Sequence, residues 1–275
     1  MAPPLSAAKA RDLVRTAPLP EVLEAAVERL RETDEPDLRD LLLERWQNLA
    51  ANPVRLDGGA KLRTVLLQEL RPMARASDIA IFEAAVTTVE VQYGGDVAQN
   101  LRAAALYGLA QLDEPRAAWY ATRLLGDRQN VSVVTGEPAL AAARLLVTIG
   151  RPEPVYREVL LGGGHPEVRA ECIRQLEGIP RRLLVELLDD ALEGSDEAVM
   201  LGAIDLVLGH SELNAALPAL RDFMAATERL DVYRYLVTAA AASRREEAHS
   251  LLREERECET DRRKLAFLQD ALELF

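Results

Sequence analysis

The stretch HPEVRAECIRQL, residues 165–176, decides the fold. Proline and glutamate open it, as they open the first turn of many helices. Apolar residues then recur at spacings of three and four, which is the helical period. Val168, Cys172 and Leu176 therefore share one helix face, and an arginine directly follows the first of them. The stretch predicts a helix packed along one side.

The same pattern returns along the chain. Each copy has an aliphatic or small residue first, a small residue or leucine fifth, and usually an aliphatic residue ninth, and a second helix-like segment follows it. One helix pair cannot bury its apolar face alone, so successive pairs must stack. The copies are LRTVLLQEL at 62–70, LRAAALYGL at 101–109, ALAAARLLV at 139–147, VRAECIRQL at 168–176, AVMLGAIDL at 198–206 and VYRYLVTAA at 232–240.

We predict an all-α fold with negligible sheet, in which about sixteen helices form an α-solenoid of about eight antiparallel pairs. One domain is expected to span residues 1–275. Within it, residues 1–58 would form diverged helical repeats, 59–256 recognisable repeats, and 257–275 a capping helix. The only strand-like run, Val131–Val134, is too short to found a sheet.

These segments resemble HEAT repeats, and most closely the short bacterial HEAT-like repeats, in which an acidic or proline-bearing turn precedes Val-Arg and small residues. The resemblance implies that the helices with this pattern, here called the Val-Arg helices, line the concave side of a superhelix. It also implies that their arginine bonds a turn acid of a neighbouring repeat. Arg63, Arg102 and Arg169 match that position and are expected to clamp successive turns. Three repeats carry other residues there: Leu140, Val199 and Tyr233.

Composition narrows the function classes. The net charge is −12, whereas nucleic acid and anionic membranes require a basic surface, so a nucleic-acid partner is unlikely on charge. The chain starts without the apolar segment of a signal peptide and has no run long enough to span a membrane. We therefore expect a soluble cytoplasmic protein that does not enter membranes.

No catalytic or metal constellation emerges from the sequence. Cys172 and Cys258 are far apart and lack metal-ligand spacing, so we predict no metal site and no cofactor, and we expect Cys172 to pack in the core. The GGGH stretch at 162–165 could expose backbone N–H groups to a phosphate, but the Lys-Ser/Thr of a phosphate-binding loop is missing. A turn with helix capping is favoured there.

The two tryptophans admit two interpretations. Trp46 and Trp119 both fall within apolar helix stripes, so we expect both to fill the core. The alternative is that one of them is exposed, in which case it would be a natural binding anchor.

The leading functional prediction is a non-enzymatic scaffold or adaptor that binds a peptide or a partner domain on its concave face. Tyr107, Arg174, Asp205 and Tyr235 lie on Val-Arg helices at places that the pattern leaves outside the core. They are predicted to line one strip of that face, because tyrosine and arginine often anchor binding. An equal alternative is that Tyr107 and Tyr235 pack between adjacent helices.

Two other classes remain as alternatives through the same resemblance. HEAT-like DNA glycosylases share the repeat type but use a basic concave surface with aromatic residues near a catalytic acid. HEAT-like bilin lyases and related chaperone-type factors also resemble these repeats, although no residue here marks a tetrapyrrole site. Whether the chain has any enzymatic activity is left open.

Overall fold

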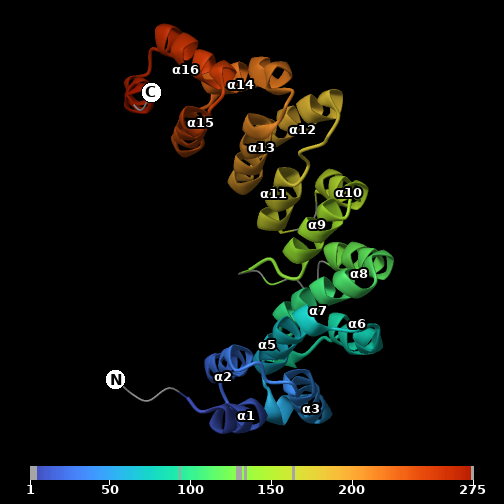
Figure 1. The fold of residues 1–275 in the computed structure, drawn as a ribbon. Coiled ribbons are helices and arrows are strands. Elements are labelled where there is room, and N and C mark those ends of the chain that lie inside the picture. Colours follow the sequence, from blue (N-terminus) through green and yellow to red (C-terminus); the bar gives the residue numbers. More distant parts are fainter. Residues whose placement is uncertain (1–4, 93, 128–131, 133–134, 163–164, 274–275) are drawn as a thin grey trace. The chain divides into compact units, whose positions relative to one another are not determined.

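The computed structural model describes residues 5–92, 94–127, 132, 135–162 and 165–273. Over these residues the chain is all-α, which confirms the predicted fold class (Figure 1). Seventeen α-helices of 4 to 14 residues are accompanied by one two-stranded hairpin. Contacts divide the chain into two compact units, residues 1–151 and 152–275. The single domain expected over residues 1–275 stays a prediction.

The first unit contains α1 (Ala7–Thr16), α2 (Pro20–Glu32), α3 (Leu38–Ala51), α4 (Pro53–Leu56), α5 (Lys61–Leu70), α6 (Ile79–Val86), α7 (Gln99–Leu112), α8 (Glu114–Gly126) and α9 (Ala139–Thr148). Two short 3-10 helices, η1 (Arg71–Met73) and η2 (Ala76–Asp78), join α5 to α6. The Val-Arg helices stack in sequence: α5 packs on α7, and α7 packs on α9. The second helices α6 and α8 both pack against α7.

The second unit contains α10 (Glu153–Leu161), α11 (Pro166–Arg174), α12 (Arg181–Glu193), α13 (Glu197–Gly209), α14 (Leu213–Ala226), α15 (Leu230–Ala242), α16 (Glu246–Cys258) and α17 (Arg262–Leu272). Its alternate helices form two layers. One layer runs α11, α13, α15 and α17, and the other runs α12, α14 and α16, with each helix packed on the next of its layer. Within this unit a second helix follows each of the Val-Arg helices α11, α13 and α15, as the repeat pattern predicts.

Local signals explain where these helices begin and end. Asp113 caps α8 by accepting a hydrogen bond from the backbone N–H of Arg116 at 3.0 Å, which satisfies an amide that the helix itself leaves free. At the other end of a helix, Gly162 adopts a left-handed φ of 61° directly after α10. A residue with a Cβ resists that conformation, so glycine is favoured there.

The core consists mainly of alanine and leucine, as the composition suggests. The small residues at the fifth position of the repeat allow close helix contact. The clearest case is Gly202 on α13, where an added Cβ would lie 2.7 Å from the carbonyl oxygen of Ala170 on α11. Cys172, at the fifth position of its repeat, is fully buried, and its expected place in the core is confirmed.

The only strands in the described part of the chain are β1 (Val91–Gln92) and β2 (Gly95–Asp96), which pair antiparallel with Val91 opposite Asp96. They lie just before α7. The strand-like run at 131–134 falls outside the described residues, apart from Ser132. None of the described helices is long and apolar enough to cross a membrane.

Residues 244–264 are rich in charged side chains and contain α16 and the first turn of α17. α17 packs against α15 and α16. Lys264 of α17 is buried, and its Nζ donates to the carbonyl oxygen of Met224 at 2.6 Å. The same Nζ lies 4.9 Å from the ring centre of Tyr233, within the range of a cation–π contact. A lysine from the last helix thus contacts the tyrosine that replaces the repeat arginine of α15.

Candidate functional site

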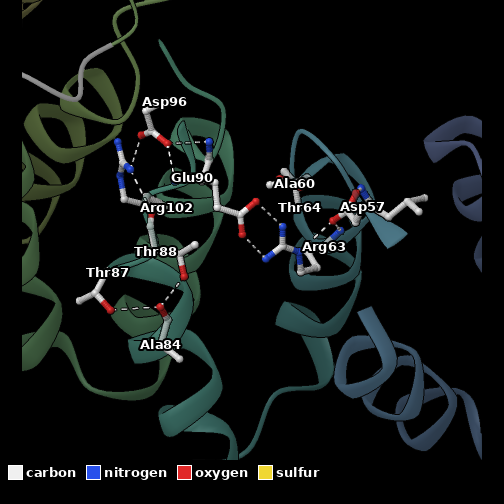
Figure 2. Close-up of polar contacts among 12 residues, drawn as sticks. Asp57, Ala60, Arg63, Thr64, Ala84, Thr87, Thr88, Glu90, Asp96 and Arg102 are labelled. Atoms are coloured by element: carbon white, nitrogen blue, oxygen red, sulfur yellow. Dashed lines mark hydrogen bonds and ion pairs between the residues drawn. The ribbon is translucent and has the colours of Figure 1, made fainter. Parts of the chain in front are cut away.

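Arg63 of α5 joins two turns of the first unit (Figure 2). Its Nε donates to Asp57 at 2.9 Å, and its two terminal nitrogens donate to Glu90 at 2.7 and 2.9 Å. Asp57 also accepts from the backbone N–H of Leu62 at 2.9 Å, so it caps α5 as well. Only 4% of the Arg63 side chain is exposed. The expected bond from this arginine to a turn acid of the next repeat is present.

Arg102 of α7 makes a related contact. It forms an ion pair with Asp96 and donates to the carbonyl oxygen of Thr88 at 3.0 Å (Figure 2). Only 2% of the Arg102 side chain and 3% of the Asp96 side chain are exposed. The acid lies six residues before the arginine, as Asp57 lies six residues before Arg63. The two arginines therefore share one local arrangement, in which a turn acid binds the arginine of the helix that follows.

Arg169 of α11 departs from this arrangement. Its Nε donates to the carbonyl oxygen of Val159 at 3.2 Å, and it forms no ion pair with any residue that the structure describes. Within the described residues Arg169 is therefore held by a backbone carbonyl oxygen instead of an acid. The sequence gives the reason: the residue six before Arg169 is Gly163, which has no carboxylate.

Three of the four predicted binding residues come together in the second unit. The Nε of Arg174 on α11 donates to Asp205 on α13 at 2.8 Å, and the hydroxyl of Tyr235 on α15 donates to the other oxygen of Asp205 at 2.5 Å. All three side chains are partly exposed. These three side chains, here called the polar strip, lie across α11, α13 and α15. They are bonded to one another through Asp205.

Tyr107 lies on α7, in the first unit, and is partly exposed. A single strip that joins it to the three residues of the second unit stays a prediction.

We expect Tyr235→Phe to reduce the loss of stability at alkaline pH. Burial, followed by the hydrogen bond to Asp205, raises the pKa of Tyr235 to about 12, against about 10 in an unfolded chain. Because the folded state favours the neutral hydroxyl, its contribution is full below about pH 10 and is lost as the pH rises through about 12. Urea unfolding across this window should give a steeper fall for the wild type. Parallel curves for the two proteins would contradict the assignment.

The large exposed apolar side chains lie outside the helices that carry the polar strip. Among the described residues, no large exposed apolar side chain belongs to a Val-Arg helix. They lie on other helices, on the hairpin or in connecting segments: Leu19, Val54, Leu56, Val89, Val91, Trp119, Leu160 and Leu161.

The two tryptophans differ. Trp46 is 8% exposed, which confirms its place in the core. Trp119 on α8 is 80% exposed, so the expectation that it fills the core is wrong. The buried stripe of α8 runs through Ala117, Ala121 and Leu124. Trp119 is two residues from Ala117, which places it about 200° round the helix, on the opposite side.

Sequence reasoning missed His210, which is buried in the turn between α13 and α14. Its Nδ1 accepts from the backbone N–H of Glu212 at 3.0 Å, and its Nε2 lies 3.1 Å from the carbonyl oxygen of Ile179. The first bond leaves the proton on Nε2, which then donates to Ile179. His210 thus links two successive turns of the second unit. A histidine three residues before the first residue of a helix would have been the available signal.

The described residues include one buried cysteine, Cys172. They contain no group of three or more histidine, cysteine or acidic side chains arranged to hold a metal ion. Burial, with a contribution from Glu158 and Glu171, raises the pKa of the Cys172 thiol to about 12. This thiol is protonated at neutral pH and is not an activated nucleophile.

Comparison of the chain with protein-family models, with curated proteins and with solved structures found no match.

Proposed function

We propose that this protein is a non-enzymatic interaction scaffold that binds a peptide or a partner domain. The exposure of Trp119 is the observation that carries the proposal. In a chain with 12 aromatic residues, a tryptophan that is 80% exposed on a rigid helix is costly to leave in water. Tryptophan is also among the residues most enriched at binding hot spots. Arg123, one helical turn away, is also exposed and adds a positive charge beside the ring.

The polar strip of Arg174, Asp205 and Tyr235 keeps a restricted role in this proposal. Arg174 and Tyr235 are bonded to Asp205, so they would contact a partner through their exposed edges. Pre-ordered side chains on rigid helices lose little entropy when they bind. We therefore propose Trp119 as an apolar anchor of the first unit and, independently of it, the strip as a polar contact of the second unit.

Charge argues against the DNA-binding alternative. Residues 1–151 carry 20 acidic and 18 basic side chains, and residues 152–275 carry 25 acidic and 15 basic ones. Both units are therefore net negative, at −2 and −10. A protein that contacts several phosphates needs a basic surface, and neither unit supplies the net positive charge for one.

We expect Trp119→Ala to weaken partner binding by about thirtyfold, since a hot-spot tryptophan contributes about 2 kcal/mol or more. Folding should be unaffected because the side chain is exposed. A partner is first isolated by affinity capture with the wild-type chain and purified. Its Kd is then measured by calorimetry against the wild type, Trp119→Ala and the control Thr122→Ala, an exposed residue of the same helix. Turnover of a small molecule without any protein partner would overturn the proposal.

A further inference from the structure

A groove of about 100 Å³ lies between α10, α11 and α12 of the second unit. Its lining is mixed, and the apolar part includes Val159, Ile173 and Leu187. Leu160 also lines it and is 63% exposed. The next residue, Leu161, is 51% exposed, so apolar surface continues along the end of α10 beyond the groove itself. A partner that covered both leucines would need to be longer than a small carboxylic acid.

Arg169 places one positive charge in this groove. Arg63 and Arg102 occupy the same repeat position, and each is held by the carboxylate six residues before it. Gly163 stands there for Arg169, whose side chain makes one hydrogen bond to the described residues, from Nε to the carbonyl oxygen of Val159. A guanidinium can bind a carboxylate through two parallel bonds, and a carbonyl oxygen satisfies only part of that capacity. Arg169 therefore lines the groove without the carboxylate that Arg63 and Arg102 each have six residues earlier.

Two acidic side chains limit what can enter the groove. Glu186 and Asp190 of α12 also line it, and Glu186 accepts from Arg182 at 3.0 Å. Two carboxylates in the same groove as one arginine repel a ligand with many negative charges, such as nucleic acid. A segment with a single carboxylate beside an apolar side chain matches Arg169 and the apolar part of the lining.

We infer that this groove binds a segment of a partner protein in which one aspartate or glutamate lies next to an aliphatic or aromatic residue. The carboxylate pairs with Arg169, in the role that Asp57 and Asp96 fill for Arg63 and Arg102. The apolar neighbour packs on Leu160 and the groove wall. The inference rests on the proposed scaffold function and adds the chemistry of the partner.

The test selects peptides against the full chain. A displayed library of random peptides of about twelve residues is panned on the wild-type protein, and enriched peptides are synthesised and their Kd values measured. We expect an enriched pattern of one acid beside an apolar residue. Replacing that acid by its amide should weaken binding at least about tenfold, because a charge-assisted pair is lost.

Matched variants locate the binding. Arg169→Gln and Leu160→Ser should each weaken peptide binding at least about tenfold, whereas Arg169→Lys should restore part of it because the charge remains. Arg157→Gln, an exposed arginine on α10 that does not line the groove, is the control and should bind as the wild type does. Melting temperatures of all variants show whether each is folded.

Three results would overturn the inference. Enriched peptides whose binding is unaffected by Arg169→Gln would remove the groove but leave the scaffold proposal in place. Self-association that is lost in Leu160→Ser, with no peptide enriched, would assign the groove to a second copy of this chain. If no peptide is enriched, the chain stays monomeric and the Trp119 experiment finds no partner, both proposals fail.

Discussion

Arg63→Met is expected to lower the free energy of unfolding of the first unit by about 3–5 kcal/mol. The replacement removes the cation but leaves the carboxylates of Asp57 and Glu90 with little exposure to water. Breaking a buried ion pair from one side carries a cost of this size, because an uncompensated charge stays in a medium of low polarity. Urea unfolding of the full chain, followed by circular dichroism, gives the change.

The control for this experiment is Arg182→Met, whose partner is Glu186 one turn further along α12. The Arg182 side chain is 90% exposed, so losing its ion pair should cost less than about 1 kcal/mol. Arg63→Lys keeps a charge but cannot bind both carboxylates through a planar fork, so it should fall between wild type and Arg63→Met. If Arg63→Met and Arg182→Met cost the same, Arg63 does not clamp the turns.

The pattern of the repeat predicts the helices because one physical cause acts throughout. Apolar residues that recur at every third or fourth place of a segment fall on one side of a helix, and packing buries that side. The second helices were therefore placed correctly, and the small fifth position marks real close contact, as at Gly202. The contacts of Arg63 follow from the same register, because Asp57 and Glu90 lie in the turns beside α5 and α7.

Contacts that depend on a residue outside the pattern could not be predicted in the same way. The partner of Arg169 depends on the residue type at 163, in the preceding turn, and the resemblance to the repeat family says nothing about it. Lys264 reaches Met224 across 40 positions of sequence, a distance that no local period encodes. The expectation for Trp119 is wrong because an apolar residue in a helical segment need not lie on its buried side. The angle of Trp119 round α8 differs from that of the buried stripe.

The candidate site shows the same limit. The repeat register brings Arg174, Asp205 and Tyr235 to one strip, so the sequence predicted their proximity. It did not predict that they would bond to one another, because hydrogen bonding depends on side-chain direction as well as position. The exposure of Trp119 could not be predicted for a different reason. The pattern identifies core positions and does not distinguish among the remaining positions of a helix.

Gly202→Ala is expected to destabilise the second unit by about 2–3 kcal/mol, although alanine favours a helix over glycine by about 1 kcal/mol. The new Cβ would lie 2.7 Å from the carbonyl oxygen and 3.0 Å from the Cα of Ala170. These are backbone atoms within a buried helix, so no side chain can rotate away and α11 and α13 must separate.

The matched control is Gly209→Ala, at the end of the same helix, where an added Cβ meets no atom within 4 Å. It should leave stability unchanged or raise it slightly, since only helix propensity acts there. Separation of α11 from α13 should also lengthen the 2.8 Å contact between Arg174 and Asp205, which spans the same two helices. Chemical denaturation measures the first effect, and the NMR signal of the Arg174 Nε–H reports the second. If Gly202→Ala is as stable as Gly209→Ala, α11 and α13 are free to move apart, and the polar strip is not held rigidly by this contact.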